Sequence, residues 1–339
     1  GELTVEPAPG VAIVPTNTLG QHTGVVVARQ GTTLVTATTP LFTSCSTGTC
    51  AITPAPFASA TPTANQPALS YFVHQGAPYF QPVPGSAWSA DGGALPTAPG
   101  LIFSQGQKLG TAYVSGTTLK VADLDGGAWD TTNAVTAWTS TGAYPIDGTT
   151  TVQTASALDL SGTRATCIVL QTGTKVVPLS RLNSGAFGIP LTNNPAASGL
   201  SVTQVRGFAT TAFCTFAYVL TSGAVVYSHI PPGDFGTSNN LQTFVAGGVS
   251  EVDIIQDVYN SIVNSYWLAS IESGQLYLYY STGTAGTRVP LPLGATSLNA
   301  DPSCVASKPT LTQYDQAIYV TWQERCAGQQ WKVYTRALW

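Results

Sequence analysis

Short apolar segments alternate with turn-forming residues along the whole chain, and one arrangement of them occurs seven times. Each copy begins with an apolar segment, passes through a turn that contains a glycine, and continues with a second apolar segment. The turn glycines, spaced 40 to 57 residues apart, are Gly31, Gly76, Gly116, Gly173, Gly223, Gly274 and Gly328. The position three residues after each glycine is also apolar in every copy: Leu34, Tyr79, Leu119, Val176, Val226, Tyr277 and Trp331. This regularity indicates a sevenfold internal repeat.

The segments that flank these turns have the composition of β-strands. They are rich in Val, Ile, Thr, Tyr, Phe and Trp, and they are bounded by Gly, Pro, Asn and Ser. No helical pattern of apolar positions runs beyond two turns. The best candidate for a helix, residues 251–262, is rich in β-branched residues and is better interpreted as a strand, a turn and a second strand. The chain is therefore predicted to be all-β.

A repeat of about 40–50 residues with several strands is typical of a β-propeller blade. We therefore expect residues 1–339 to form a single domain, a seven-bladed β-propeller. The last blade lacks outer strands, so residues 1–17 are expected to close it, with segments 3–7 and 11–15 pairing with the C-terminal blade. This closure predicts that both termini are ordered and close together. A pair of β-sandwiches and a β-solenoid are the alternatives, but the Pro/Thr/Ala-rich stretch 51–67 lies too early for a linker between two sandwiches.

The repeats resemble the broad β-propeller superfamily over nearly the whole chain. In particular, segment 317–338 is similar to the inner hairpin of sialidase-type and lectin-type propellers. The Gly-His and Trp-Asp signature of tryptophan-aspartate repeats is missing. Segments 89–93 and 125–129 depart from the spacing of sialidase Ser-x-Asp-x-Gly-x-Thr-Trp boxes. The resemblance therefore implies a fold and no specific family.

Composition narrows the functional classes. Only 8% of residues are charged, the net charge is −4, and the 12 Lys and Arg residues form no basic run. Nucleic acids and anionic lipid surfaces are therefore not expected as partners, because both are bound through clustered cations. No run of 18 apolar residues occurs, so no transmembrane helix is expected. The neutral, hydroxyl-rich composition is typical of a β-rich protein.

The chain has six cysteines, an even number that predicts disulfides and an oxidising compartment. Cys45 and Cys50 lie in one short loop, and Cys304 and Cys326 flank the last inner strand. Cys167 and Cys214 are then left to pair across neighbouring blades. Metal binding is the alternative, but no histidine lies near any pair. The chain begins at Gly1 and contains no Met, which favours a secreted protein whose leader has been removed.

Paired carboxylates are the first candidates for catalysis on polysaccharides. The chain has only five Glu, and two of them, Glu272 and Glu324, are predicted at the ends of inner strands on one propeller face. The alternative is that both are solvated rim carboxylates. The remaining hydrolase signatures, such as a nucleophile elbow, do not occur.

Metal sites have weak support. Asp123, Asp125 and Asp130 form one incomplete copy of a calcium-binding pattern, and an Asx-type turn explains them equally well. The histidines at 22, 74 and 229 fall in different repeats and have no metal-ligand spacing. We therefore expect no metal and no cofactor.

Aromatic residues supply the remaining candidates. Trp88, Trp129 and Trp138 are predicted in loops rich in Gly, Ser and Asp, where an exposed ring can stack on a sugar. Packing inside a blade is the alternative for all three. Three tryptophans within predicted strands are expected in the core: Trp267, Trp322 and Trp331.

These observations favour three functions, in decreasing order. The first is a non-catalytic structural or adhesive subunit of an extracellular layer, filament or appendage, which self-associates through its neutral surface. The second is a glycan-binding lectin. The third is a polysaccharide hydrolase or lyase, which the shortage of Glu, Lys and His disfavours.

Overall fold

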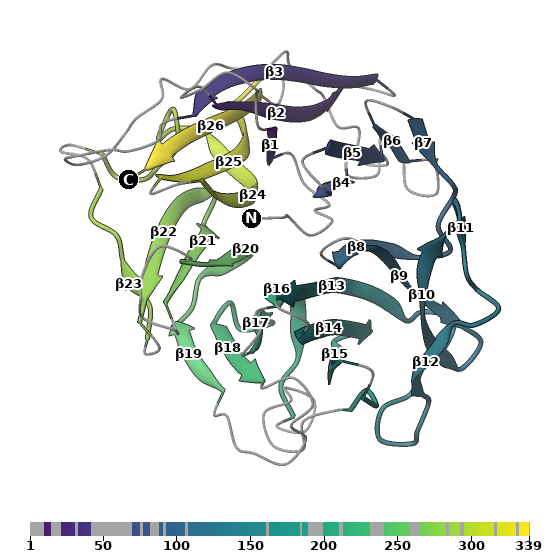
Figure 1. Ribbon diagram of the computed structural model, residues 1–339. Helices are drawn as coiled ribbons and strands as arrows, with labels where there is room; N and C mark the ends of the chain where they lie inside the picture. Colours follow the sequence, from purple (N-terminus) through teal and green to yellow (C-terminus); the bar gives the residue numbers. More distant parts are fainter. Residues whose placement is uncertain are drawn as a thin grey trace. The chain divides into compact units, whose positions relative to one another are not determined.

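The computed structural model consists of β-strands joined by turns and loops, with no helix among the described residues (Figure 1). It describes residues 10–14, 22–30, 33–41, 70–74, 77–81, 88–90, 93–105, 108–160, 163–183, 185–188, 199–209, 213–230, 241–257, 265–282, 285–291, 295–314, 317–329 and 332–338. Within these ranges no helix is long and apolar enough to cross a membrane. The contacts divide the chain into two compact units, which are described separately. One contains residues 6–93 and 248–339, and the other contains residues 94–247.

The unit of residues 94–247 holds strands β8 to β19. An eight-stranded sheet contains β8 (Leu101–Gln105), β9 (Lys108–Ser115), β10 (Thr118–Asp125), β11 (Ala128–Trp129), β12 (Val135–Thr139), β13 (Thr151–Leu160), β14 (Thr163–Thr172) and β15 (Lys175–Leu182). A four-stranded sheet contains β16 (Val202–Ala209), β17 (Cys214–Leu220), β18 (Val225–Ile230) and β19 (Gln242–Val245). A single parallel pair, Gln105 with Ala157, joins the two halves of the larger sheet.

The other unit holds four sheets, one of which ends at the boundary between the units. The first contains β1 (Gly10–Val14), β2 (His22–Gln30) and β3 (Thr33–Leu41). The second contains β4 (Ser70–His74), β5 (Ala77–Gln81), β6 (Trp88–Ala90) and β7 (Gly93–Leu95). The third contains β20 (Val249–Gln256), β21 (Tyr266–Glu272), β22 (Gln275–Ser281) and β23 (Thr287–Arg288). The last contains β24 (Val305–Tyr314), β25 (Ala317–Arg325) and β26 (Lys332–Leu338).

Apart from the parallel β8–β13 pair and the pairing of β12 with β10, the sheets are built from strands that follow one another in the chain and pair antiparallel. Successive up-and-down sheets of about four strands are the building unit of β-propellers. The prediction of an all-β chain composed of such units is confirmed. The number of blades and the closure of a ring remain predictions.

The repeat found in the sequence corresponds to a series of hairpins. The five described turn glycines all have positive φ, between 59° and 80°, and each connects two antiparallel strands: Gly116, Gly173, Gly223, Gly274 and Gly328. Positive φ is strained for residues with a Cβ atom, which explains the glycine at each turn. Gly31 and Gly76 lie outside the described residues, but the strands on either side of each pair antiparallel.

The apolar position three residues after the glycine is not structurally equivalent in every hairpin. Gly173 is the first residue of its two-residue turn, whereas Gly274 is the second residue of its turn. Val176 is the second residue after its turn and points into a hydrophobic core. The second residue after the Gly274 turn is Leu276, which is likewise fully buried. Tyr277 is displaced by one residue and lies on the opposite face of its sheet, because side chains alternate between faces.

The predicted pairing of segment 11–15 with the C-terminal blade is wrong. Strand β1 pairs antiparallel with β2, from Gly10 opposite Val27 to Val14 opposite Thr23. Only a short connection separates β1 from β2, so little loop entropy opposes this local pairing. β1 also contacts β24 and β25 without joining their sheet. Segment 3–7 and both chain ends lie outside the described residues.

Hydrophobic cores form between the two halves of the eight-stranded sheet and between neighbouring sheets. The first core packs β8–β10 against β13–β15 of the same sheet. Another packs β14 and β15 against β16–β18, and a third packs β21 and β22 against β24–β26. Trp267 and Trp322 belong to the third core, which confirms their predicted burial, and Trp331 lies outside the described residues. The sheets therefore bury one another's apolar faces.

Two of the three predicted disulfides are present, and the third lies outside the described residues. Cys167 of β14 is bonded to Cys214 of β17, 47 residues apart. Cys304, directly before β24, is bonded to Cys326, directly after β25. Cys45 and Cys50 belong to the undescribed segment 42–69. Each observed disulfide lies within one compact unit.

Candidate functional site

The sheet β20–β23 carries a polar cluster on one face and a hydrophobic core on the other. The strand register places Ser270 opposite Tyr277 and Tyr279 opposite Arg288, so these side chains share one face. The intervening residues Ile271 and Leu276 point to the other face and join the core with β24–β26. A two-residue turn, Ser273 and Gly274, places Glu272 at the end of β21 on the polar face.

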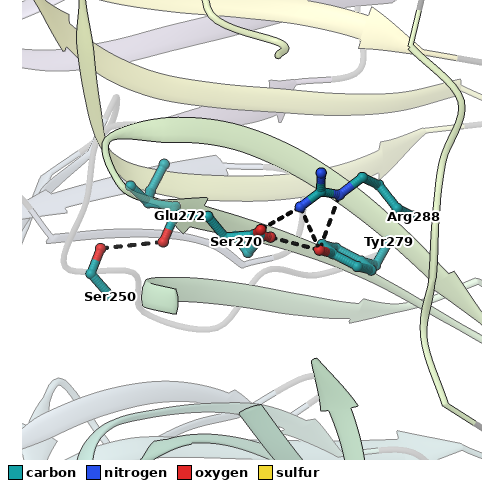
Figure 2. A network of polar contacts seen from close by, with 6 residues as sticks. Ser250, Ser270, Glu272, Tyr279 and Arg288 are labelled. Carbon is teal, nitrogen blue, oxygen red and sulfur yellow. Dashed lines mark hydrogen bonds and ion pairs between the residues drawn. The ribbon is translucent and has the colours of Figure 1, made fainter. Parts of the chain in front are cut away.

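Glu272 is the centre of this cluster (Figure 2). Its Oε1 atom accepts hydrogen bonds from Ser270 Oγ at 2.8 Å and from the Tyr279 hydroxyl at 2.7 Å. Its Oε2 atom pairs with Arg288 Nη2. Arg288 also donates from Nε and Nη2 to the Tyr279 hydroxyl, at 3.1 and 3.0 Å. Ser250, at the edge of the cluster, donates to the carbonyl of the residue before Glu272 at 3.3 Å.

Arg288 is the exposed member of the cluster. Its guanidinium carbon lies 3.8 Å from the centroid of the Tyr277 ring and 5.5 Å from that of Tyr279. Its side chain is 45% exposed, whereas that of Glu272 is 14% exposed. A cation over an aromatic face is stabilised by the ring quadrupole, so the guanidinium is held in one orientation while part of it contacts solvent.

The Tyr279 hydroxyl is held neutral. Burial, together with the hydrogen bond to Glu272, raises its pKa to about 12. The phenol therefore stays protonated. It donates a hydrogen bond to the carboxylate and accepts hydrogen bonds from Arg288. This tyrosine bridges two charges and is poorly suited to act as a nucleophile, which requires a lowered pKa.

Glu324 has a different environment: it is buried, so the alternative of a solvated rim carboxylate is wrong for this residue. Its side chain is buried in β25 and accepts hydrogen bonds from three donors. These are the backbone N–H of Ala300 and of Asp301, both at 2.9 Å, and Trp322 Nε1 at 2.9 Å. The carboxylate holds the loop that precedes β24 in place. Its burial and full set of donors favour a structural role.

The three aspartates of the predicted calcium pattern do not converge. Asp123 and Asp125 belong to β10, and the Asp130 carboxylate accepts from Asn133 Nδ2 at 2.9 Å and from its backbone N–H at 3.1 Å. These bonds lower the pKa of Asp130. The predicted Asx-type turn thus accounts for this residue. Among the described residues the one group with metal-ligand spacing is Asp301, Cys304 and Cys326, and its cysteines form a disulfide.

The tryptophans proposed for glycan contact lie on strands and not in loops. Trp129 belongs to β11 and donates to the Pro96 carbonyl at 2.9 Å. Trp138 belongs to β12 and packs edge-on against Tyr144 beside a core. Both strands pair with β10, but opposite Leu124 and Leu119, which point to opposite faces. The two rings therefore cannot line one site. Trp88 belongs to β6, and the position of its side chain is not described.

His229 is the one histidine whose side chain is described. It lies in β18, with its Nδ1 atom 3.2 Å from Thr215 Oγ1, and contacts Tyr227 edge-on at 4.8 Å. Burial lowers its pKa to about 4. A neutral imidazole packed among aromatic rings is a structural element of its sheet.

Sequence reasoning selected Glu272 but missed Ser270, Tyr279 and Arg288. Tyr277 and Tyr279 are two residues apart in a strand, and this spacing indicates a shared face. The spacing of the repeat counts from Gly274, which is one residue later in its turn than Gly173 is, so it does not group Tyr277 with the polar face. Arg288 joins them through a strand of two residues, for which the sequence carries no periodic signal.

Comparison with protein-family models and with curated protein sequences finds no match. Solved structures similar to this chain include a sialidase of Trypanosoma rangeli, at 9% identity and a TM-score of 0.48, covering 98% of this chain and 55% of the sialidase. They also include the BP39L lectin of Burkholderia pseudomallei, at 13% identity and a TM-score of 0.47, covering 96% and 98%. A third is the lectin of Aleuria aurantia, described as a six-bladed β-propeller that recognises fucose, at 12% identity and a TM-score of 0.39, covering 80% and 91%. The chain spans about half the length of the sialidase. At these values, function has to be argued from the chain's own residues.

Proposed function

We propose that this protein is a secreted, non-catalytic glycan-binding protein whose site is formed by Glu272, Tyr277, Tyr279 and Arg288. The observation that carries the proposal is the half-exposed Arg288, held flat on the Tyr277 ring and tied to Glu272 and Tyr279. Its Nη1 atom makes no hydrogen bond within the described part of the chain, so two N–H donors face a ligand in a fixed orientation. The two disulfides support an oxidising, extracellular location.

The chemistry of the cluster suits a sugar. A guanidinium donates to hydroxyl oxygens, a carboxylate accepts from hydroxyl protons, and an aromatic ring packs against the C–H face of a pyranose. The charges of Glu272 and Arg288 cancel within the cluster. A neutral glycan with neighbouring hydroxyl groups is therefore the ligand class that fits best.

Binding is favoured over catalysis because both carboxylates proposed for catalysis already hold several protein donors. Glu272 pairs with Arg288 and accepts hydrogen bonds from two hydroxyl groups, so a substrate oxygen would have to compete with these partners for its carboxyl group. Glu324 is buried beneath the loop that precedes β24. A hydrolase would also need a second carboxyl group placed near Glu272.

The test is a glycan array followed by calorimetric titration of the best ligand. Arg288→Gln and Tyr277→Ala are expected to weaken binding by at least about tenfold, because each removes a direct contact. Arg206→Gln is the matched control, since the one bond of Arg206 to a described residue is to the neighbouring Val205 carbonyl in the other unit. A folded protein that binds no glycan, or binding unchanged in both variants, would contradict the proposal.

A structural subunit is the second candidate, supported by the last strand. Within the described residues β26 pairs only with β25, so one edge of it presents unpaired backbone groups. Such an edge accepts a strand from another copy. Electron microscopy of the protein at its source distinguishes the two: a filament or lattice supports the structural function, and isolated particles favour glycan binding alone. The same images test whether the chain is a single ring of seven blades, as we also propose.

A further inference from the structure

Arg181 in β15 is a buried cation whose guanidinium has no hydrogen-bonding partner among the described residues. Only 7% of the residue is exposed, and its guanidinium carbon lies 4.5 Å from the centroid of the Phe187 ring. Its Nε atom is completely buried, and no hydrogen bond or ion pair of the guanidinium is present within the described ranges. Arg181 belongs to the unit of residues 94–247, whereas the glycan-binding cluster belongs to the other unit.

A second buried polar atom lies beside it. Thr166 of β14 stands directly opposite Arg181 in the strand register, so both side chains point to the same face. Thr166 is fully buried, and its Oγ1 atom also has no partner among the described residues. Two hydrogen-bonding groups on neighbouring strands thus lie side by side on one face of the β14–β15 pair.

The surrounding charges leave this place positive. Burial lowers the pKa of Arg181, and the Asp123 carboxylate and the Arg164 guanidinium act on it in opposite directions. Arg164 lies two residues before Thr166 on the same face of β14. Two guanidinium groups and one carboxylate leave a single net positive charge.

Buried donors without an acceptor destabilise the folded protein. A buried polar group without a hydrogen bond costs free energy, and a buried charge costs more. A carboxylate matches the planar fork of a guanidinium and removes this cost by accepting two hydrogen bonds. The guanidinium fork is planar, and its contact with the Phe187 ring restricts the orientation of the fork.

We propose that Arg181, with Thr166 and Arg164, forms a binding site for a small carboxylate. The single net positive charge favours a monovalent anion over sulfate or phosphate. Thr166 donates a hydrogen bond from its hydroxyl group to the second lone pair of one carboxylate oxygen. The site is independent of the glycan-binding cluster, so either proposal can fail without the other.

The experiment is calorimetric titration of the full chain with sodium acetate at constant ionic strength, with sodium sulfate in parallel. We expect one acetate site with a dissociation constant on the order of 1 mM, and weaker binding of sulfate. Arg181→Lys keeps the charge but loses the fork, and is expected to weaken acetate binding by about tenfold. Arg206→Gln, which removes a cation elsewhere in the same unit, leaves acetate binding unchanged.

Asp123→Asn distinguishes a loss of the binding site from a loss of the fold. It removes the opposing negative charge, so acetate is expected to bind several-fold more tightly, which damage to the fold would not produce. The proposal is overturned if the folded wild-type protein binds no acetate at tens of millimolar. It is also overturned if Arg181→Lys binds acetate as well as the wild type, or if sulfate binds more tightly than acetate.

Discussion

The carboxylate of Asp253 in β20 accepts a hydrogen bond from the backbone N–H of Leu311 in β24 at 2.7 Å, although 58 residues separate them. A corresponding bond occurs in the other unit, where Ser156 Oγ of β13 accepts from the backbone N–H of Ala209 in β16 at 3.0 Å, 53 residues away. In both units, therefore, a side chain of one sheet satisfies the backbone N–H of an edge strand in the next sheet. These bonds link neighbouring sheets that share no backbone ladder.

The first prediction concerns these bonds. Asp253→Ala is expected to lower the free energy of unfolding by about 2–3 kcal/mol, because a buried N–H loses a charged acceptor. Ser156→Ala loses a neutral acceptor and is expected to cost about 1 kcal/mol. Urea unfolding monitored by tryptophan fluorescence measures both values. Asp253→Asn retains an acceptor oxygen and serves as the control, with an effect smaller than that of alanine.

The second prediction separates stability from function at Glu324. Glu324→Gln is expected to lower the free energy of unfolding by about 2 kcal/mol. In the variant, an amide NH₂ group faces N–H donors that bond to the carboxylate in the wild type. Thermal unfolding measures the loss, and glycan binding at low temperature is expected to be unchanged. Asp125→Asn, at an exposed hairpin turn, is the matched control and should stay within about 0.5 kcal/mol of the wild type.

The third prediction concerns the dependence of stability on pH at His229. Its folded pKa of about 4 lies below the ordinary value of 6.5, so the unfolded chain binds this proton more tightly. Stability from this residue is complete above pH 6.5 and falls as the pH is lowered towards 4, by up to about 3 kcal/mol. Urea unfolding at pH 7, 5.5 and 4.5 measures it. In His229→Gln this part of the pH dependence should vanish, and an unchanged slope would refute the assignment.

The fourth prediction compares two turn glycines. Gly173→Ala places a Cβ atom in open space at φ 60°, and the left-handed backbone alone is expected to cost about 1 kcal/mol. Gly274→Ala has φ 78° and also brings the Cβ atom within 3.0 Å of Val305 Cγ1. The second variant is therefore expected to be the less stable one by urea unfolding. Equal losses would mean that Val305 moves aside without cost.

Local patterns were sufficient to predict the hairpins and two of the disulfides. Glycine is needed wherever a turn requires positive φ, so Gly173 and Gly328 mark their hairpins without reference to the rest of the chain. Cys304 and Cys326 flank one hairpin strand, and their pairing follows from that position. These features depend on residues close in sequence, which is why composition and spacing revealed them.

The candidate sites depend on strand register and on which sheets pack together. A shift of one residue at the Gly274 turn places Tyr277 on the polar face with Glu272, and the register of β23 brings Arg288 to them. Likewise, Trp129 and Trp138 are near in sequence but lie on opposite faces of a sheet. The sequence by itself determined the strands, their turns and the spacing of the repeat, because these depend on local conformational preferences. Only the tertiary structure decided which side chains meet, because a one-residue change in register reverses the face of every side chain in a strand.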